Sequence, residues 1–248
     1  MRILGVDTAG ATASVALVED DHLIAEESFD SAKSRAINCS VKPKGNHAEI
    51  ILPLIQLILD RTRTSLTELT GIALSIGPGS FTGLRIALAT VKGIAYDTGL
   101  PVAGISTLHA NAARAMDTEG IICSLLDARK HEVYAALFHR RGKSLSRLSE
   151  DSVISVSSVI ELLSNTAAAN ATVIGDGATA YENELRAALG AAIRLSSGDR
   201  SRSIAAQVAM LSLGRFVTGT SDDLGTLTPV YLRPSEAQSK RLLSILTC

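Results

Sequence analysis

Residues 2–29 read RILGVDTAGATASVALVEDDHLIAEESF and contain three short apolar runs separated by polar turns. The runs lie at 2–7, 12–19 and 22–29 and are rich in Val, Ile, Leu and Ala. Short apolar runs bounded by turn residues are typical of β-strands. The stretch therefore predicts three consecutive strands at the start of the fold.

A polar loop at 30–45 follows, and its role is left open; its basic residues are Lys33, Arg35, Lys42 and Lys44. Helical and strand patterns then alternate, and the expected elements are helix 46–60, strand 71–76, helix 80–98 and strand 101–105. The resulting order is β-β-β-α-β-α-β. This order predicts a mixed sheet with helices packed on it.

The second part of the chain repeats this order. Its expected elements are strands 121–127 and 132–138, a third strand near 143–150, helix 157–165, strand 172–175, helix 178–189 and strand 192–195. Two copies of one unit predict a duplicated domain with a cleft between the halves. This α/β architecture resembles the actin-like ATPase and sugar-kinase superfamily, whose halves have a ribonuclease H-like fold.

The repeat also predicts where the domains divide. We expect an N-terminal half at 1–105 and a C-terminal half at 106–200. The remainder, 201–248, contains a predicted helix at 201–217 that packs back on the N-terminal half.

Composition excludes several classes of protein. The formal net charge of the 248 residues is −1, without a long basic run, which argues against a dedicated nucleic-acid binder. Cys39, Cys123 and Cys248 are far apart and have no zinc-ligand spacing, so neither a disulfide framework nor a zinc knuckle is expected. The N-terminus reads as a strand rather than a signal segment, and no apolar run approaches the length of a membrane span. We therefore expect a cytoplasmic protein without a membrane partner.

The first strand of each half ends in an aspartate, Asp7 or Asp127. In the first half, Thr8 and Gly10 follow, and a glycine turn allows the backbone to approach phosphate oxygens. Asp7, Thr8 and Gly10 are therefore candidate nucleotide-binding residues. In the second half, Arg129 and Lys130 occupy the turn without a glycine. These cations either attract phosphate or simply form a charged hairpin turn.

The predicted helix 46–60 is apolar all round, whereas a helix lying on a sheet needs only one apolar stripe. Asn46 is a candidate cap for its first turn. An all-round apolar helix needs cover on two sides, so we expect the sheet on one side and another domain or protein chain on the other.

The predicted helix 80–98 has one face of large apolar residues and a second face of small ones. Small side chains allow another helix to approach closely. Together the two helices predict half of a helix bundle that another subunit completes. The predicted interface residues are His47, Ile50, Ile51, Leu54, Leu57, Ile58, Gly83, Arg85, Ile86, Ala89, Thr90 and Gly93.

Residues 75–89 read SIGPGSFTGLRIALA, a glycine-rich segment between a strand and a helix. It lacks the lysine and spacing of a phosphate-binding P-loop, and it lacks the dinucleotide pattern G-x-G-x-x-G. Gly77, Pro78 and Gly79 are therefore predicted to form a sharp structural turn, with Ser80 or Thr82 capping the helix.

Several stretches of the chain resemble the TsaB (YeaZ) family, a bacterial component of the machinery that makes threonylcarbamoyladenosine at position 37 of tRNA. The matching stretches are GVDTAGATASVALV (5–18), NHAEIILPLI (46–55), GPGSFTGLRIALA (77–89), LLDARKHEVYAALF (125–138), GDGA (175–178) and PVYLRP (229–234). The resemblance implies a two-domain actin-like fold and a scaffold or activator rather than a catalyst.

The resemblance also implies partners. These are the catalytic subunit TsaD, the ATPase TsaE, tRNA through the complex, and a second copy when the protein is alone. No cofactor is required, although ATP or ADP can lodge at a subunit interface. TsaD-type proteins carry two metal-binding histidines one helical turn apart, and no two histidines of this chain have that spacing. We therefore expect no metal site and no catalytic residue.

Two enzymatic alternatives stay open at this point. One is an actin-like enzyme that hydrolyses or transfers the phosphate of ATP, with Asp7 and Asp127 on a metal across the cleft. The other is a glycoprotease-like peptidase, although Ser80 and Ser106 have no accompanying catalytic motif.

Overall fold

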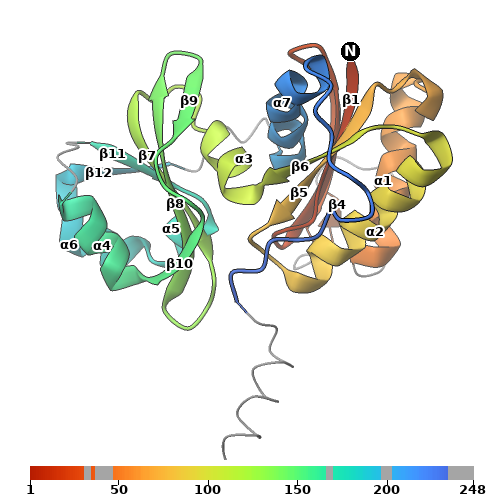
Figure 1. Ribbon diagram of the computed structural model, residues 1–248. Coiled ribbons are helices and arrows are strands. Elements are labelled where there is room, and N and C mark those ends of the chain that lie inside the picture. Colours follow the sequence, from red (N-terminus) through yellow and green to blue (C-terminus); the bar gives the residue numbers. More distant parts are fainter. Residues whose placement is uncertain (31–34, 37–46, 166–169, 197–202, 234–248) are drawn as a thin grey trace, which may run out of the picture.

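The protein folds into two α/β halves that lie side by side, with the short helix α3 (Thr107–Ala113) between them (Figure 1). The computed structural model describes residues 1–30, 35–36, 47–165, 170–196 and 203–233. The basic residues Lys33, Lys42 and Lys44, the expected cap Asn46, and Cys39 and Cys248 lie outside these ranges.

The first sheet has the strand order β4-β3-β2-β1-β5-β6. Its strands are β1 (Arg2–Asp7), β2 (Thr12–Glu19), β3 (His22–Asp30), β4 (Arg35–Ala36), β5 (Gly71–Gly77) and β6 (Val102–Ser106). Strand β1 pairs antiparallel with β2 and parallel with β5. The prediction of a mixed sheet that begins with three consecutive strands is therefore confirmed.

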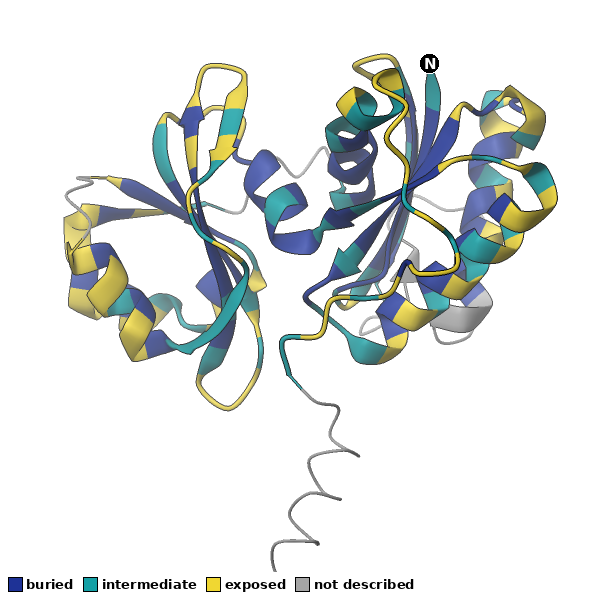
Figure 2. Cartoon of the chain, in the orientation of Figure 1, coloured by how far each residue is buried: buried dark blue, intermediate teal, exposed yellow. Residues whose placement is uncertain are grey.

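Helices cover both faces of this sheet. One face carries α1 (His47–Thr62) and α2 (Phe81–Thr98), and η1 (Leu66–Glu68) lies between them in sequence. The other face carries α7 (Ile204–Val217), which packs on β1, β2 and β5. Figure 2 shows that the strands are mostly buried, whereas the outer sides of the helices are exposed.

The second half repeats the pairing order, with β10-β8-β7-β11-β12 in place of β3-β2-β1-β5-β6. Its strands are β7 (Gly120–Asp127), β8 (Glu132–Arg141), β9 (Ser144–Arg147), β10 (Ser152–Ser155), β11 (Ala171–Ile174) and β12 (Ile193–Ser196). Its helices are α4 (Val156–Asn165), α5 (Asp176–Ala180), α6 (Glu182–Leu189) and η2 (Gly190–Ala192). The predicted duplication of an actin-like half is confirmed.

The elements differ from the expectation in three details. The expected third strand near 143–150 is present as β9, but it forms a hairpin arm on β8, and β10 takes the place that β3 has in the first sheet. The expected helix 178–189 is two helices, because the backbone leaves the helical region at Tyr181. The sequence did not predict helix α3, which is short and is capped by Ser106, whose hydroxyl accepts a hydrogen bond from the His109 amide.

Helix α7 comes unusually close to the first strand at Gly5. A Cβ atom at this position would lie 2.1 Å from the Ala205 carbonyl oxygen and 3.0 Å from the Ala209 Cβ. Both neighbours are alanines on the inner side of α7, so the helix backbone rests almost directly on β1. The first half therefore includes a helix that follows the whole second half in sequence.

Helix α3 packs on the second half through His109 and Phe138 of β8, whose ring centres are 5.2 Å apart. The Arg147 guanidinium lies 4.9 Å from the centre of the Phe138 ring. Burial and, secondarily, Arg147 lower the pKa of His109 from 6.5 to about 4. Its Nε2 atom is buried and has no hydrogen-bond partner within the described ranges. The contact between α3 and the second half therefore favours a neutral imidazole.

None of the helices in the described part of the chain is both long and apolar enough to cross a membrane.

The close approach at Gly5 predicts that Gly5→Ala lowers the free energy of unfolding by about 3 kcal/mol, because α7 must move away from the sheet. The matched control is Gly214→Ala on α7 itself, where no described atom lies within 4 Å of the added Cβ. This control is expected to stabilise the helix by up to about 1 kcal/mol. Urea unfolding measures both values, and equal effects at the two glycines would contradict the packing argument.

The buried imidazole predicts a pH dependence of stability. Because the pKa of His109 is lower in the folded chain than its ordinary 6.5, its contribution is complete above pH 6.5 and is lost as the pH falls toward 4. The loss amounts to roughly 3 kcal/mol at most. His109→Leu is expected to remove this part of the dependence in thermal unfolding between pH 7 and 4. The exposed His22→Leu serves as the control, and an unchanged pH profile in His109→Leu would refute the assignment.

Candidate functional site

The tip that follows β1 holds Asp7 inside the protein, with only 3% of the residue exposed. Its Oδ1 atom accepts a hydrogen bond from the Ala9 amide at 3.2 Å and another from the Ser75 hydroxyl. The carboxylate therefore ties the tip of the β1–β2 hairpin to strand β5.

Thr8 connects the same tip to helix α2. Its hydroxyl is fully buried and donates to the Gly83 carbonyl in the first turn of α2 at 2.7 Å. The Ser80 amide donates to the Ala9 carbonyl, also at 2.7 Å. These bonds join the hairpin tip to the start of α2.

The Gly77-Pro78-Gly79 segment forms the turn between β5 and α2, and the tip packs directly on it. A Cβ atom on Gly79 would lie 2.5 Å from the Ala9 carbonyl oxygen, so this close contact requires glycine. Ser80 caps the helix, since its hydroxyl accepts from the Gly83 amide. Gly10, by contrast, is not crowded, because a Cβ atom there would have its nearest neighbour 4.0 Å away.

The corresponding tip in the second half is exposed and is built differently. Asp127 Oδ1 accepts from the Arg129 amide at 2.8 Å and from the Tyr181 hydroxyl at 3.3 Å. Arg129, Lys130 and His131 all have positive φ values, between 55° and 63°. The cations therefore form the hairpin turn itself, as one of the two sequence alternatives proposed.

Asp7 and Asp127 each accept hydrogen bonds from their own hairpin tip. In the ranges that the structure describes, no group of three or more His, Cys, Asp or Glu side chains is arranged to hold a metal ion. Asp127 accepts the hydrogen bonds that shape its turn, and its amide donates to Asp176 Oδ1 at 2.9 Å. Burial raises the pKa of the Asp176 carboxyl above its usual value.

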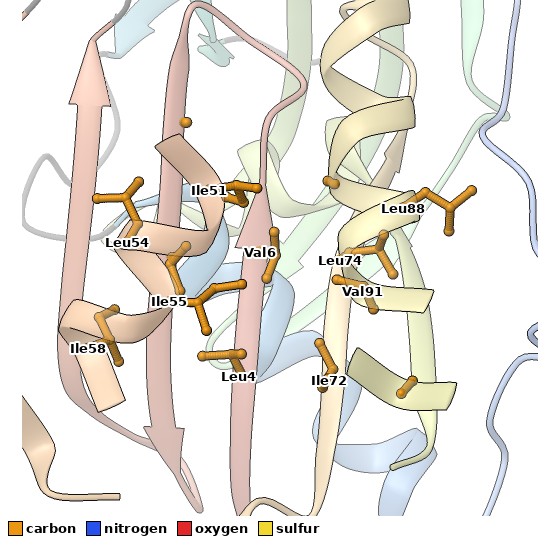
Figure 3. Close-up of a cluster of buried hydrophobic side chains, with 14 of the residues drawn as sticks. Leu4, Val6, Ile51, Leu54, Ile55, Ile58, Ile72, Leu74, Leu88 and Val91 are labelled. Atoms are coloured by element: carbon orange, nitrogen blue, oxygen red, sulfur yellow. The ribbon is translucent and has the colours of Figure 1, made fainter. Parts of the chain in front are cut away.

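The predicted partner interface on α1 needs correction. Ile50, Ile51, Leu54 and Ile58 are buried, because α1 lies on β2 and β3. Figure 3 shows Ile51, Leu54 and Ile58 between the helix and the sheet. They belong to the core of this chain and are unavailable to a partner. The chain's own sheet thus covers the side of α1 on which these residues lie. Gly83 of α2 is likewise buried. The side chain of His47 lies outside the described part of the chain.

The remaining predicted residues point outward or lie at the border of the core. Arg85, Ala89 and Gly93 are exposed, whereas Leu57, Ile86 and Thr90 are half-buried. The three exposed residues, together with two further exposed residues of α2, define an outer stripe at helical spacing. The outer stripe consists of Thr82, Arg85, Ala89, Gly93 and Tyr96.

Sequence reasoning missed two apolar side chains beside these residues. Tyr96 is 89% exposed at the end of the outer stripe, and Leu52 of α1 is 54% exposed. The spacing of Tyr96 from Ala89 and Gly93 was a usable signal, because residues three and four apart share a helix face.

A third missed residue, Tyr231, comes from the C-terminal segment and lies at the start of the outer stripe. Its hydroxyl accepts a hydrogen bond from Arg85 Nε at 2.9 Å, and its ring centre lies 4.5 Å from that of Phe81. The Arg85 guanidinium also lies 3.9 Å from the centre of the Phe81 ring. The first turns of α2 therefore carry a compact aromatic and cationic cluster.

Comparisons with known proteins agree with this architecture. The sequence profile of the TsaD family, tRNA N6-adenosine threonylcarbamoyltransferase, matches residues 40–210. The tRNA threonylcarbamoyladenosine biosynthesis protein TsaB of Escherichia coli (strain K12) is 30% identical over 242 residues, which cover 97% of this chain and 98% of that protein. TsaB of Bacillus subtilis (strain 168) is 25% identical over 240 residues, with 97% of both chains covered.

A solved structure, YeaZ from Pseudomonas aeruginosa, has the same fold, with a TM-score of 0.69 and 24% identity. The match covers 93% of this chain and 99% of that one. The two-sheet architecture and the full-length similarity to the Escherichia coli protein lead to one assignment. The chain belongs to the TsaB (YeaZ) family of proteins that act in tRNA threonylcarbamoyladenosine biosynthesis.

Proposed function

We propose that this chain is the non-catalytic scaffold and activator subunit in the synthesis of threonylcarbamoyladenosine at position 37 of tRNA. It binds the catalytic subunit TsaD, and the complex assembles with the ATPase TsaE in the cytoplasm. The observation that supports this role best is the outer stripe on α2, an exposed helix face with small residues at its centre.

The centre of the outer stripe is suited to a second helix. Ala89 and Gly93 have almost no side chain, and no described atom lies within 4 Å of the position that a Gly93 Cβ would take. A facing helix can therefore approach the α2 backbone closely. Tyr96 and Leu52 offer large apolar surfaces at the edges, and exposed aromatic side chains are frequent anchors in protein interfaces.

The geometry of α1 and α2 supports one mode of binding. The two helices pack side by side on the same face of the sheet, and their outer sides are exposed (Figure 2). A partner of the same fold would present a matching pair, and the four helices would form a bundle. TsaD qualifies as such a partner, since its family profile matches this chain over 40–210. In its absence, a second copy of this chain occupies the same face.

The hairpin tips favour a supporting role over catalysis. Asp7 and Thr8 bond to Ser75 and to the first turn of α2, so these polar groups organise the helix that carries the outer stripe. tRNA reaches the protein through the complex, and the chain itself needs no cofactor. ATP or ADP then binds, if at all, where subunits meet.

Ala89→Glu is expected to weaken the complex with TsaD at least about 100-fold, because a carboxylate would be buried against the facing helix. The site is exposed, so the substitution should change folding stability by less than about 0.7 kcal/mol. Titration calorimetry measures the affinity, and a tRNA modification assay measures the consequence. The same variant should make the isolated protein monomeric on gel filtration.

Lys143→Glu, on the exposed β8–β9 turn of the second half, is the matched charge-changing control and should leave binding unchanged. If Ala89→Glu bound TsaD with the same affinity as the unsubstituted protein, the proposal that the outer stripe forms the interface would be wrong.

Thr8→Val separates a structural from a catalytic role of the first hairpin tip. Loss of the bond to the Gly83 carbonyl should lower the free energy of unfolding by about 1–3 kcal/mol. With TsaD and TsaE present, and with enough folded protein to saturate the complex, tRNA modification should reach the same maximum rate. A maximum rate that falls by orders of magnitude in a folded Thr8→Val protein would instead support an enzymatic role. Thr8→Ser, which keeps the hydroxyl, is the control.

A further inference from the structure

The C-terminal segment at residues 229–233, called the strap below, makes contacts with both halves of the protein. Figure 1 shows this segment passing over the first half and reaching the neighbourhood of the second. Its contacts begin on the first half, where the Val230 amide donates to the Ile76 carbonyl at 2.7 Å. A Cβ atom on Gly77 would lie 2.6 Å from the Val230 carbonyl oxygen, so glycine gives the strap its place beside β5.

The next residue fixes the strap to α2. Tyr231 packs on Phe81 and accepts the hydrogen bond from Arg85. Two independent kinds of contact, a backbone hydrogen bond and an aromatic–guanidinium cluster, thus hold the strap on the first half.

Arg233 then extends to the second half. Its Nη1 atom donates to the Ala128 carbonyl at 2.9 Å, and its Nη2 atom forms an ion pair with the Glu132 carboxylate. Ala128 and Glu132 flank the β7–β8 turn and are themselves paired, since the Ala128 amide donates to the Glu132 carbonyl. One side chain therefore holds both ends of that turn.

We infer that the strap is an interdomain clamp that sets the position of the second half relative to the first. The chain crosses between the halves at α3 and again between β12 and α7, and α3 packs on elements of both halves. The contacts of Arg233 at the β7–β8 turn add a further restraint at a separate point, and separated contacts restrict how the second half can turn relative to the first. The clamp is a property of this chain by itself and does not depend on the proposed partners.

The release of Arg233 should be visible without any partner. Nitroxide labels at Asp21→Cys in the first half and Lys143→Cys in the second report the distance between exposed turns of the two halves. Cys39→Ser and Cys248→Ser remove two competing thiols, and Cys123 is buried. We expect a narrow distance distribution with the strap intact, and a broader, shifted one in Arg233→Ala and Arg233→Glu.

Hydrogen exchange provides a second readout at the strap itself. Loss of the charged contacts in Arg233→Ala should accelerate exchange of the Val230 amide about 10-fold, because the strap separates from β5 more often. Tyr231→Ala removes the contacts of the strap with Phe81 and Arg85 and should likewise accelerate exchange of the Val230 amide. Arg186→Ala breaks an exposed ion pair within α6 and should change neither readout.

A charge exchange tests the specific pair. Adding Glu132→Arg to Arg233→Glu restores opposite charges at the same place and should narrow the label distance again. If the label distances and the Val230 exchange rate stay the same in Arg233→Glu, Arg233→Ala and Tyr231→Ala, the strap does not act as a clamp.

Discussion

The contact between α7 and Gly5 determines how the whole chain is arranged. Because this helix covers the second face of the first sheet, the first half is complete only after residues from the C-terminal part return to it. In the chain, the second half is therefore inserted between α3 and α7 of the completed first half. The strands of the first sheet are covered by helices on both faces, which explains why β1 and β2 are buried along nearly their whole length.

The return of the chain also places the strap. After α7, Asp222 accepts from the Gly104 amide and pairs with Arg215, which fixes the segment beside β6. Leu227 then enters the core cluster under α2. The chain therefore runs past β6 to Ile76 of β5, where the Val230 amide binds. From there Arg233 contacts the second half. The clamp thus follows from the same packing that completes the first sheet.

The sequence predicted the order of strands and helices well, because both halves contain short apolar runs with clear boundaries. It failed where contacts between distant residues decide the outcome. The apolar surface of α1 suggested cover by a partner, but its buried residues face β2, β3 and α2, which together enclose a wide arc of the helix. Helix α3 is a single short segment without a clear helical pattern. Tyr231 and Arg233 lie in the family-matching stretch PVYLRP, but their partners are more than a hundred positions away, so the local sequence does not predict these contacts.

The duplicated halves differ at their hairpin tips, and this difference bears on the proposed function. In the first half, Thr8 fastens the tip to the first turn of α2, and Arg85 and Tyr231 fasten the strap to the same turns. The outer stripe begins on these turns as well. A partner helix packed on α2 would therefore contact the element on which the strap is seated. In the proposed complex, binding at the outer stripe and the position of the second half would be linked through Arg85 and the strap, which would give the proposed scaffold a physical means to respond to its partner.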